Sequence, residues 1–131
     1  MIGLDTNILL RLLVDDGSPD VQKARRWAAA QAVAGEAFYV DAVVLVEVVW
    51  VLESVFGYAR NEIAVAIDAL LGNAAYTVDT REAVAYALAA FRTGNFDFSD
   101  CLIVARCAHA GCAITATLDK SMRKLSGAKV I

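Results

Sequence analysis

The sequence contains little of what several classes of protein depend on. Its 131 residues include one histidine, one proline and three cysteines, and no Cys-x-x-Cys pair is present. The single histidine leaves no His-Glu-x-x-His motif and no Cys/His zinc set within the chain. The cysteines, Cys101, Cys107 and Cys112, lie in or just after one apolar segment. We expect them to be buried, reduced thiols.

Long uncharged hydrophobic runs are also missing, although 59% of the residues are hydrophobic and the mean hydropathy is +0.54. The most apolar stretch, residues 42–52, is interrupted by Glu47 and falls short of the roughly 20 apolar residues that a membrane-spanning helix needs. The N-terminus has no pattern typical of a signal peptide. We therefore expect one domain, residues 1–131, in the cytoplasm and without a membrane segment.

Excess positive charge is absent, since the net charge is −3 and the isoelectric point is about 5.0. This argues mildly against a protein that holds nucleic acid by bulk electrostatics. Basic residues could still act locally on nucleic acid, namely Arg11, Lys23, Arg25, Arg26, Lys120, Arg123 and Lys124. Among these, Arg11 and the set Lys120, Arg123 and Lys124 could hold phosphates. A solvated surface role is the alternative for each. A cluster of cation-binding acids would lower the isoelectric point of a nuclease as well.

What the sequence does contain is an alternation of short strands and helices. Short apolar segments that end in turns predict strands before Asp5 and at 38–40, 76–78, 113–117 and 127–131. Helical patterns occupy 8–13, 19–33, 41–56, 60–71, 80–92 and 101 to near 111. Residues 41–56 are rich in valine, which suits a strand, but their length favours a buried helix. The alternation predicts an α/β fold with a mainly parallel sheet of four or five short strands, covered on both faces.

Four acidic residues occupy comparable places in this pattern. Asp5 and Asp119 directly follow predicted strands, and Glu47 and Asp100 lie in or at the start of apolar helices. Because strand carboxyl ends and the helices after them share one edge of a parallel sheet, this layout can bring the four together. Helix or turn capping is the alternative for Asp5, Asp100 and Asp119. Glu47 stands among valines and leucines, where an unpaired carboxylate is unfavourable.

A group of four carboxylates predicts a particular chemistry. Carboxylates that lie close together repel one another and raise one another's pKa values unless cations neutralise them. Oxygen-only ligands favour hard divalent ions, Mg²⁺ or Mn²⁺, over zinc. Such ions can activate a water and stabilise charge during phosphodiester hydrolysis, so the acids indicate a metal-dependent nuclease.

The same residues carry a resemblance to a known family. The opening segment 5–11 (DTNILLR), Glu47 within LVEVVWVL, the DFSD segment 97–100 and the TLD segment 117–119 resemble a PIN domain. More narrowly, they resemble the VapC toxins of bacterial type II toxin–antitoxin modules. The likeness covers essentially the whole chain in order, and it implies a PIN-like three-layer α/β/α fold.

The resemblance implies an endoribonuclease that depends on Mg²⁺ or Mn²⁺. The residues that match the family's catalytic and metal-binding acids are Asp5, Glu47, Asp100 and Asp119. Asp119 would be the more variable of these and would often act through water. The residues that match supporting polar positions are Thr6, Asn7 and Thr117. Asp97 is a less certain neighbour, and a helix cap is its favoured role.

The resemblance also implies partners, namely an RNA substrate, a second copy in a homodimer, and a cognate VapB-type antitoxin that covers the acidic site. Two other functions remain open. One is a PIN-domain nuclease of RNA processing or repair without an antitoxin. The other is a non-catalytic binding module whose acids only cap helices.

Overall fold

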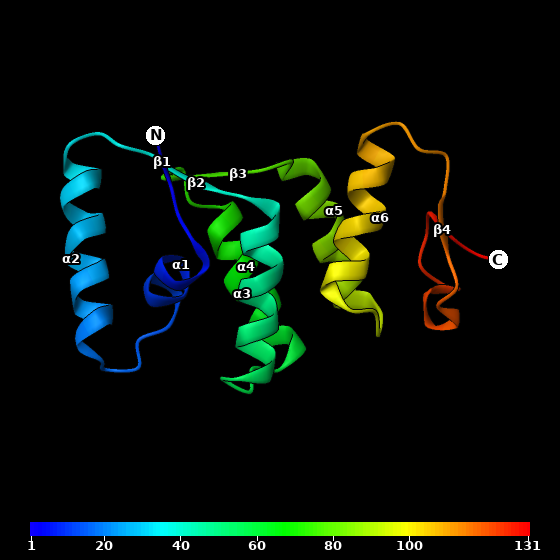
Figure 1. Cartoon of the computed structure of the whole chain (residues 1–131), viewed down its shortest axis with the longest axis horizontal. Helices are drawn as coiled ribbons and strands as arrows, with labels where there is room; N and C mark the ends of the chain where they lie inside the picture. The colour runs from blue at the N-terminus through cyan, green and yellow to red at the C-terminus, as the bar shows by residue number, and fades with distance from the viewer.

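The computed structural model of the protein describes residues 1–131 and contains six α-helices, one 3₁₀ helix and five strands (Figure 1). The α-helices are α1 (Thr6–Leu13), α2 (Pro19–Val33), α3 (Ala42–Ser54), α4 (Arg60–Leu71), α5 (Arg81–Thr93) and α6 (Phe98–His109). The strands are β1 (Ile2–Gly3), β2 (Phe38–Val40), β3 (Tyr76–Val78), β4 (Thr115–Thr117) and β5 (Ala128–Val130), and the 3₁₀ helix is η1 (Lys120–Met122). The predicted order of elements is confirmed.

All strand pairs are parallel, which confirms the predicted α/β class, but the strands form two sheets. One sheet has the order β1-β2-β3, with Ile2 opposite Phe38. The other contains β4 and β5 alone, with Thr115 opposite Ala128. The single central sheet of four or five strands is therefore divided into three and two. In Figure 1 the helices stand side by side from α2 to α6, and β4 lies beyond α6, at the end away from α2.

The core contains only hydrophobic side chains. Of the 131 residues, 31 are buried, and none of these is polar or charged. In α3 the buried residues include Leu45, Val48 and Leu52, which recur at helical spacing on one face. The prediction that residues 41–56 form a buried helix and not a strand is thus confirmed. Asp41 begins the helix, since its Oδ1 accepts a hydrogen bond from the Val43 amide at 2.7 Å.

The cysteines differ from one another in burial. Cys101 is buried, and burial is the main cause that raises the pKa of its thiol to about 11. Cys107 is half-buried and Cys112 is exposed. The prediction of buried thiols is therefore confirmed for Cys101 and wrong for Cys112, which lies past the end of α6. No helix is both long and apolar enough to cross a membrane.

Candidate functional site

Asp5 lies between β1 and α1 and is exposed. Its Oδ1 accepts a hydrogen bond from the Ile8 amide at 3.0 Å, so the side chain caps α1. Thr6 and Asn7, the two predicted supporting residues, are the first two residues of α1, and Asn7 is exposed. Asp5 therefore has the helix-capping role that the sequence offered as an alternative.

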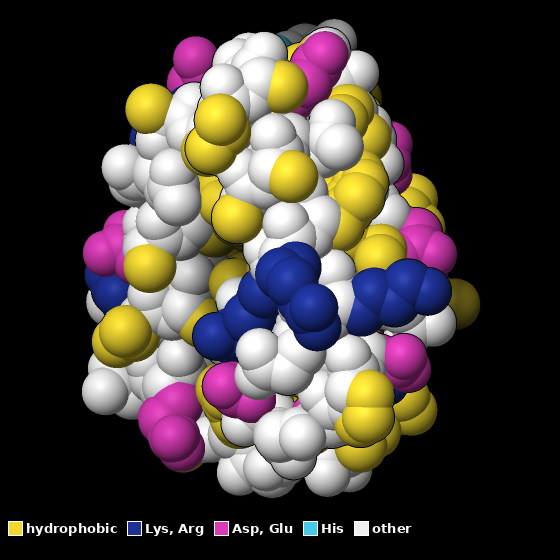
Figure 2. All heavy atoms as spheres, turned by 90° about the vertical axis from the view of Figure 1, so that its left-hand side faces the viewer, with side chains coloured by type: hydrophobic (Ala, Val, Ile, Leu, Met, Phe, Trp, Pro, Cys, Tyr) yellow, Lys and Arg dark blue, Asp and Glu magenta, His cyan; other side chains and the backbone are white.

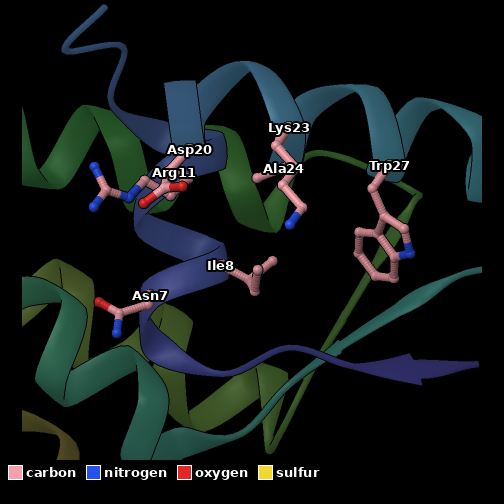
Figure 3. Close-up of a pocket in the computed structure, with 7 residues that line it drawn as sticks. All are labelled: Asn7, Ile8, Arg11, Asp20, Lys23, Ala24 and Trp27. Atoms are coloured by element: carbon pink, nitrogen blue, oxygen red, sulfur yellow. The ribbon is translucent and has the colours of Figure 1, made fainter. Parts of the chain in front are cut away.

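A hollow of about 520 Å³ lies between α1 and α2 beside Asn7. Figure 3 shows its lining, in which the Asn7 side chain points away from Lys23 and Trp27. Arg11, also at its edge, pairs with Asp16 at 3.0 Å. Figure 2 views this end of the molecule, and Asp and Glu side chains lie on it among the Lys and Arg side chains. None of the four predicted acids lines this hollow.

Glu47 is exposed, so the expectation of a carboxylate confined among apolar neighbours is wrong. The buried face of α3 is formed by other residues, and Glu47 projects from the opposite face together with Val43 and Trp50. On that face Glu47 lines a shallow groove of about 370 Å³ between α3 and α6. Ser99, the residue before Asp100, lines the same groove. Glu47 and the first turn of α6 thus line the same groove.

Asp100 is half-buried in the first turn of α6 and lies near two other acids. Partial burial is the main cause that raises the pKa of its carboxyl, and the charges of Asp97 and Asp119 raise it further. Asp97 occupies the N-cap position of α6 but makes no capping hydrogen bond with its side chain. Asp119 comes from the turn after β4. Two predicted site residues, Asp100 and Asp119, are therefore close enough for the charge of Asp119 to act on Asp100.

Asp119 is held in place by its own turn. Its Oδ1 accepts a hydrogen bond from the Ser121 amide at 2.9 Å. Hydrogen bonding from the Ser121 side chain first, and from this amide second, holds the pKa of the Asp119 carboxyl below its ordinary value. Thr117 Oγ1 accepts a hydrogen bond from the Asp119 amide at 3.0 Å and donates one to Met122 Sδ at 3.5 Å. Thr117, predicted as a supporting residue, therefore fixes the backbone that carries Asp119.

The four acids do not form one cluster. Asp5 follows a strand of the three-stranded sheet, whereas Asp119 follows a strand of the other sheet, so the two do not share a sheet edge. No three His, Cys, Asp or Glu side chains lie close enough together to hold a metal ion. Carboxylate oxygens are the type of ligand that Mg²⁺ and Mn²⁺ prefer. The four acids lie too far apart, however, to coordinate one ion together.

Two groups near these acids were not found from the sequence. Arg60, the first residue of α4, donates hydrogen bonds to the carbonyls of Phe91 at 3.0 Å and Phe96 at 2.7 Å. It thereby braces the loop that leads into α6. Arg106 of α6 pairs with Asp79, which follows β3, at 3.6 Å. Both contacts join segments far apart in the chain, so no local pattern could have indicated them.

The comparisons with known proteins identify a family. The family model of the PIN domain matches residues 2–128, nearly the whole chain. No curated protein matches the sequence. PIN domains are generally nucleases, and these nucleases generally use divalent metal ions, which agrees with the acidic residues at the start of α6 and after β4. The chain belongs to the PIN domain family.

Proposed function

We propose that the protein is a Mg²⁺- or Mn²⁺-dependent endoribonuclease that acts as the toxin of a type II toxin–antitoxin module. In this role it cleaves RNA to inhibit translation. The family supports a nuclease of some kind. The finer assignment draws on the resemblance of segments 5–11, 97–100 and 117–119 to VapC toxins.

The observation that carries the proposal is the pair formed by Asp100 and Asp119. The two carboxylates come from different elements, and the charge of one raises the pKa of the other. No ion pair involves either side chain, so neither carboxylate is used to hold elements together through a Lys or Arg. A carboxyl whose pKa is raised by burial and by neighbouring acids, with no Lys or Arg paired to it, is typical of functional sites.

The proposal of a divalent cation rests on the family and on the oxygen-only donors, since the side chains as placed form no metal site. Asp100 and Asp119 would provide carboxylate oxygens, and Asp5 and Glu47 stay predicted members of the site. A bound Mg²⁺ or Mn²⁺ supplies activation of a water and stabilisation of charge on phosphate oxygens. The chain itself contributes the turn that fixes Asp119, through Thr117 and the Ser121 amide.

The exposed face of α3 supports the proposal of protein partners. Val43 and Ile103, which line the groove, are 62% and 52% exposed, and Trp50, further along the same face of α3, is 64% exposed. Large apolar side chains gathered around one groove are typical of surfaces that another chain covers. A VapB-type antitoxin segment laid there would also cover Glu47, which lines the same groove. A homodimer is proposed as well, on the resemblance alone.

The test is cleavage of total cellular RNA by the purified chain, free of any antitoxin. Reactions would contain Mg²⁺, Mn²⁺ or EDTA, and the Asp100→Asn variant would be run beside the wild type. We expect discrete fragments that require a metal ion and that fall by about 100-fold or more in the variant. Full activity in EDTA would contradict the metal dependence, and full activity of Asp100→Asn would contradict the site.

The toxin role has its own readout. Induced expression of the wild-type chain should arrest growth, and expression of Asp100→Asn should not. Co-expression of the small open reading frame directly upstream should restore growth if it encodes the antitoxin. Cleavage without growth arrest would instead favour a nuclease of RNA processing or repair. No cleavage, with a melting temperature that metal ions leave unchanged, would favour a non-catalytic module.

A further inference from the structure

A second hollow, of about 680 Å³, lies beside the paired acids, between the loop before α6 and the turn that contains η1. One wall is formed by residues 93–96 and the other by residues from Lys120 to Lys124. Three of its lining residues are cationic and none is acidic, namely Lys120, Arg123 and Lys124. The chain as a whole carries a net charge of −3, so this concentration of positive charge is local.

The three cations have no partners within the protein. All three side chains are exposed, and none takes part in an ion pair. Lys120 and Arg123 are three residues apart, which places them on the same side of a 3₁₀ turn. Unpaired charges of one sign around a hollow attract a ligand of the opposite sign, because the hollow concentrates their field.

The position of the hollow indicates which anion it takes. Asp97 directly follows the residues of one wall, and Asp119 directly precedes those of the other. A ligand in the hollow therefore lies next to the acids that surround Asp100. Acids would repel an anion unless basic groups beside them hold it. Lys and Arg are the side chains that most often bind backbone phosphates of nucleic acids.

We propose that this hollow, lined by Lys120, Arg123 and Lys124, binds a backbone phosphate of the RNA strand next to the Asp100–Asp119 pair. The inference rests on the proposed ribonuclease function and names the part of the chain that holds its substrate. The hollow binds phosphate charge and reads neither base nor sugar. It therefore contributes affinity that depends strongly on salt concentration.

The test is direct binding of fluorescein-labelled single-stranded RNA of about 12 nucleotides, within the roughly 4–16 nucleotides that a single-strand-binding OB-fold domain covers. Binding is measured in EDTA, which prevents metal-dependent cleavage, at salt concentrations from about 25 to 200 mM. The test variant is Arg123→Gln/Lys124→Gln. The matched control is Lys23→Gln/Arg26→Gln on α2, which removes the same charge from two exposed residues without ion pairs. Circular dichroism melting confirms that both variants are folded.

We expect the test variant to bind RNA about tenfold more weakly at low salt and to lower the salt slope by about 0.7, the value for the one phosphate that the variant no longer neutralises. The control should bind within about twofold of the wild type with an unchanged slope. Equal reductions of affinity in the two variants, or an unchanged slope in the test variant, would overturn the inference. The test variant should also bind single-stranded DNA of the same sequence more weakly than the wild type does, by a similar factor. If the test variant bound only RNA more weakly and DNA as well as the wild type does, the hollow would not be a site for backbone phosphate.

These outcomes separate the inference from the proposed function. Metal-dependent cleavage by the wild type with unaltered RNA binding by Arg123→Gln/Lys124→Gln would leave the ribonuclease standing and reject the hollow. A selective loss of RNA binding, together with no cleavage under any condition, would establish the hollow and reject the ribonuclease.

Discussion

The charged residues at the two ends of the molecule are used in opposite ways. At the end formed by α1 and α2, Arg11 pairs with Asp16 and Arg25 pairs with Asp15, and Asp5 caps a helix. At the end formed by the start of α6 and the β4–β5 sheet, the cations around η1 have no acidic partners. There the charges of Asp97 and Asp119 raise the pKa of Asp100, and none of these three acids is paired with Lys or Arg.

The difference shows which charges the fold needs for itself. Surface ion pairs contribute little stability, about 0–1 kcal/mol each, but they use up charge that a ligand would otherwise meet. Mutually repelling acids weaken the fold slightly and are retained where something else binds them. At the end that contains Asp100 the unpaired cations surround a hollow with no acid in its lining, whereas Lys23 at the other end shares its hollow with Asp20. The following predictions test that contrast, from the largest expected effect to the smallest.

Arg60→Ala should produce the largest loss of stability. Arg60 bonds two carbonyls and lies over the Phe91 ring, with its guanidinium carbon 4.1 Å from the ring centroid. Removal of these interactions should lower the free energy of unfolding by about 2 kcal/mol, as measured by urea denaturation. Arg92→Ala is the matched control, because Arg92 makes only an exposed ion pair with Asp68 at 3.6 Å. The control should lose at most about 0.5 kcal/mol.

The same variant tests whether the loop before α6 positions the acids. Arg60 holds the Phe96 carbonyl, one residue before Asp97. RNA cleavage by Arg60→Ala should therefore fall at temperatures where the variant remains fully folded, whereas Arg92→Ala should cleave as the wild type does. Undiminished cleavage by folded Arg60→Ala would show that the loop does not need this brace.

Asp5 distinguishes a capping role from a functional one. Asp5→Ala removes the side chain that accepts the Ile8 amide, and it should lower the free energy of unfolding by about 1 kcal/mol. Asp5→Asn keeps a good N-cap and should leave stability nearly unchanged. Thermal denaturation of both variants measures this. Loss of RNA cleavage in the stable Asp5→Asn variant would show that Asp5 belongs to the site as well as capping α1.

The sequence predicted the elements better than their assembly. The helix at 42–54 was foreseen because its apolar run is too long for a strand. The pairing of strands was not foreseen. Strands of two or three residues carry too little side-chain pattern to specify a partner, so the separation of β4 from β1 depends on how α5 and α6 pack.

The candidate site was foreseen in part for a similar reason. Asp100 was predicted from its place at the start of an apolar helix and Asp119 from its place after a strand, and in the structure the charge of Asp119 acts on Asp100. The exposure of Glu47 could not be foreseen, because the exposed face of α3 is itself apolar. Val43 and Trp50 flank Glu47 on that face, so the number of apolar neighbours does not indicate which face is buried. The Asp79–Arg106 pair likewise depends on tertiary contact alone.

Asp100→Asn should give the smallest effect on stability, and it should be a gain. The folded state holds the Asp100 proton more tightly than the unfolded chain does, because burial, Asp97 and Asp119 raise the pKa of the carboxyl. Stability is therefore lost as the pH rises from the ordinary pKa of aspartate through the raised one, and that loss persists at neutral pH. Asn carries no charge, so the Asp100→Asn variant does not undergo this loss of stability. In metal-free buffer at pH 7, the melting temperature of Asp100→Asn should exceed that of the wild type.

The pH dependence of that gain is the sharper part of the prediction. Below the ordinary pKa of aspartate, Asp100 is protonated in both states, so the difference in melting temperature between wild type and Asp100→Asn should shrink toward zero. Asp119→Asn should behave in the opposite sense. The Ser121 hydrogen bond lowers the pKa of Asp119, so this carboxylate stabilises the fold at neutral pH and ceases to do so in acid. A lower melting temperature for Asp100→Asn at neutral pH would mean that Asp100 stabilises the fold. It would then resemble the compensated charges at the α1–α2 end.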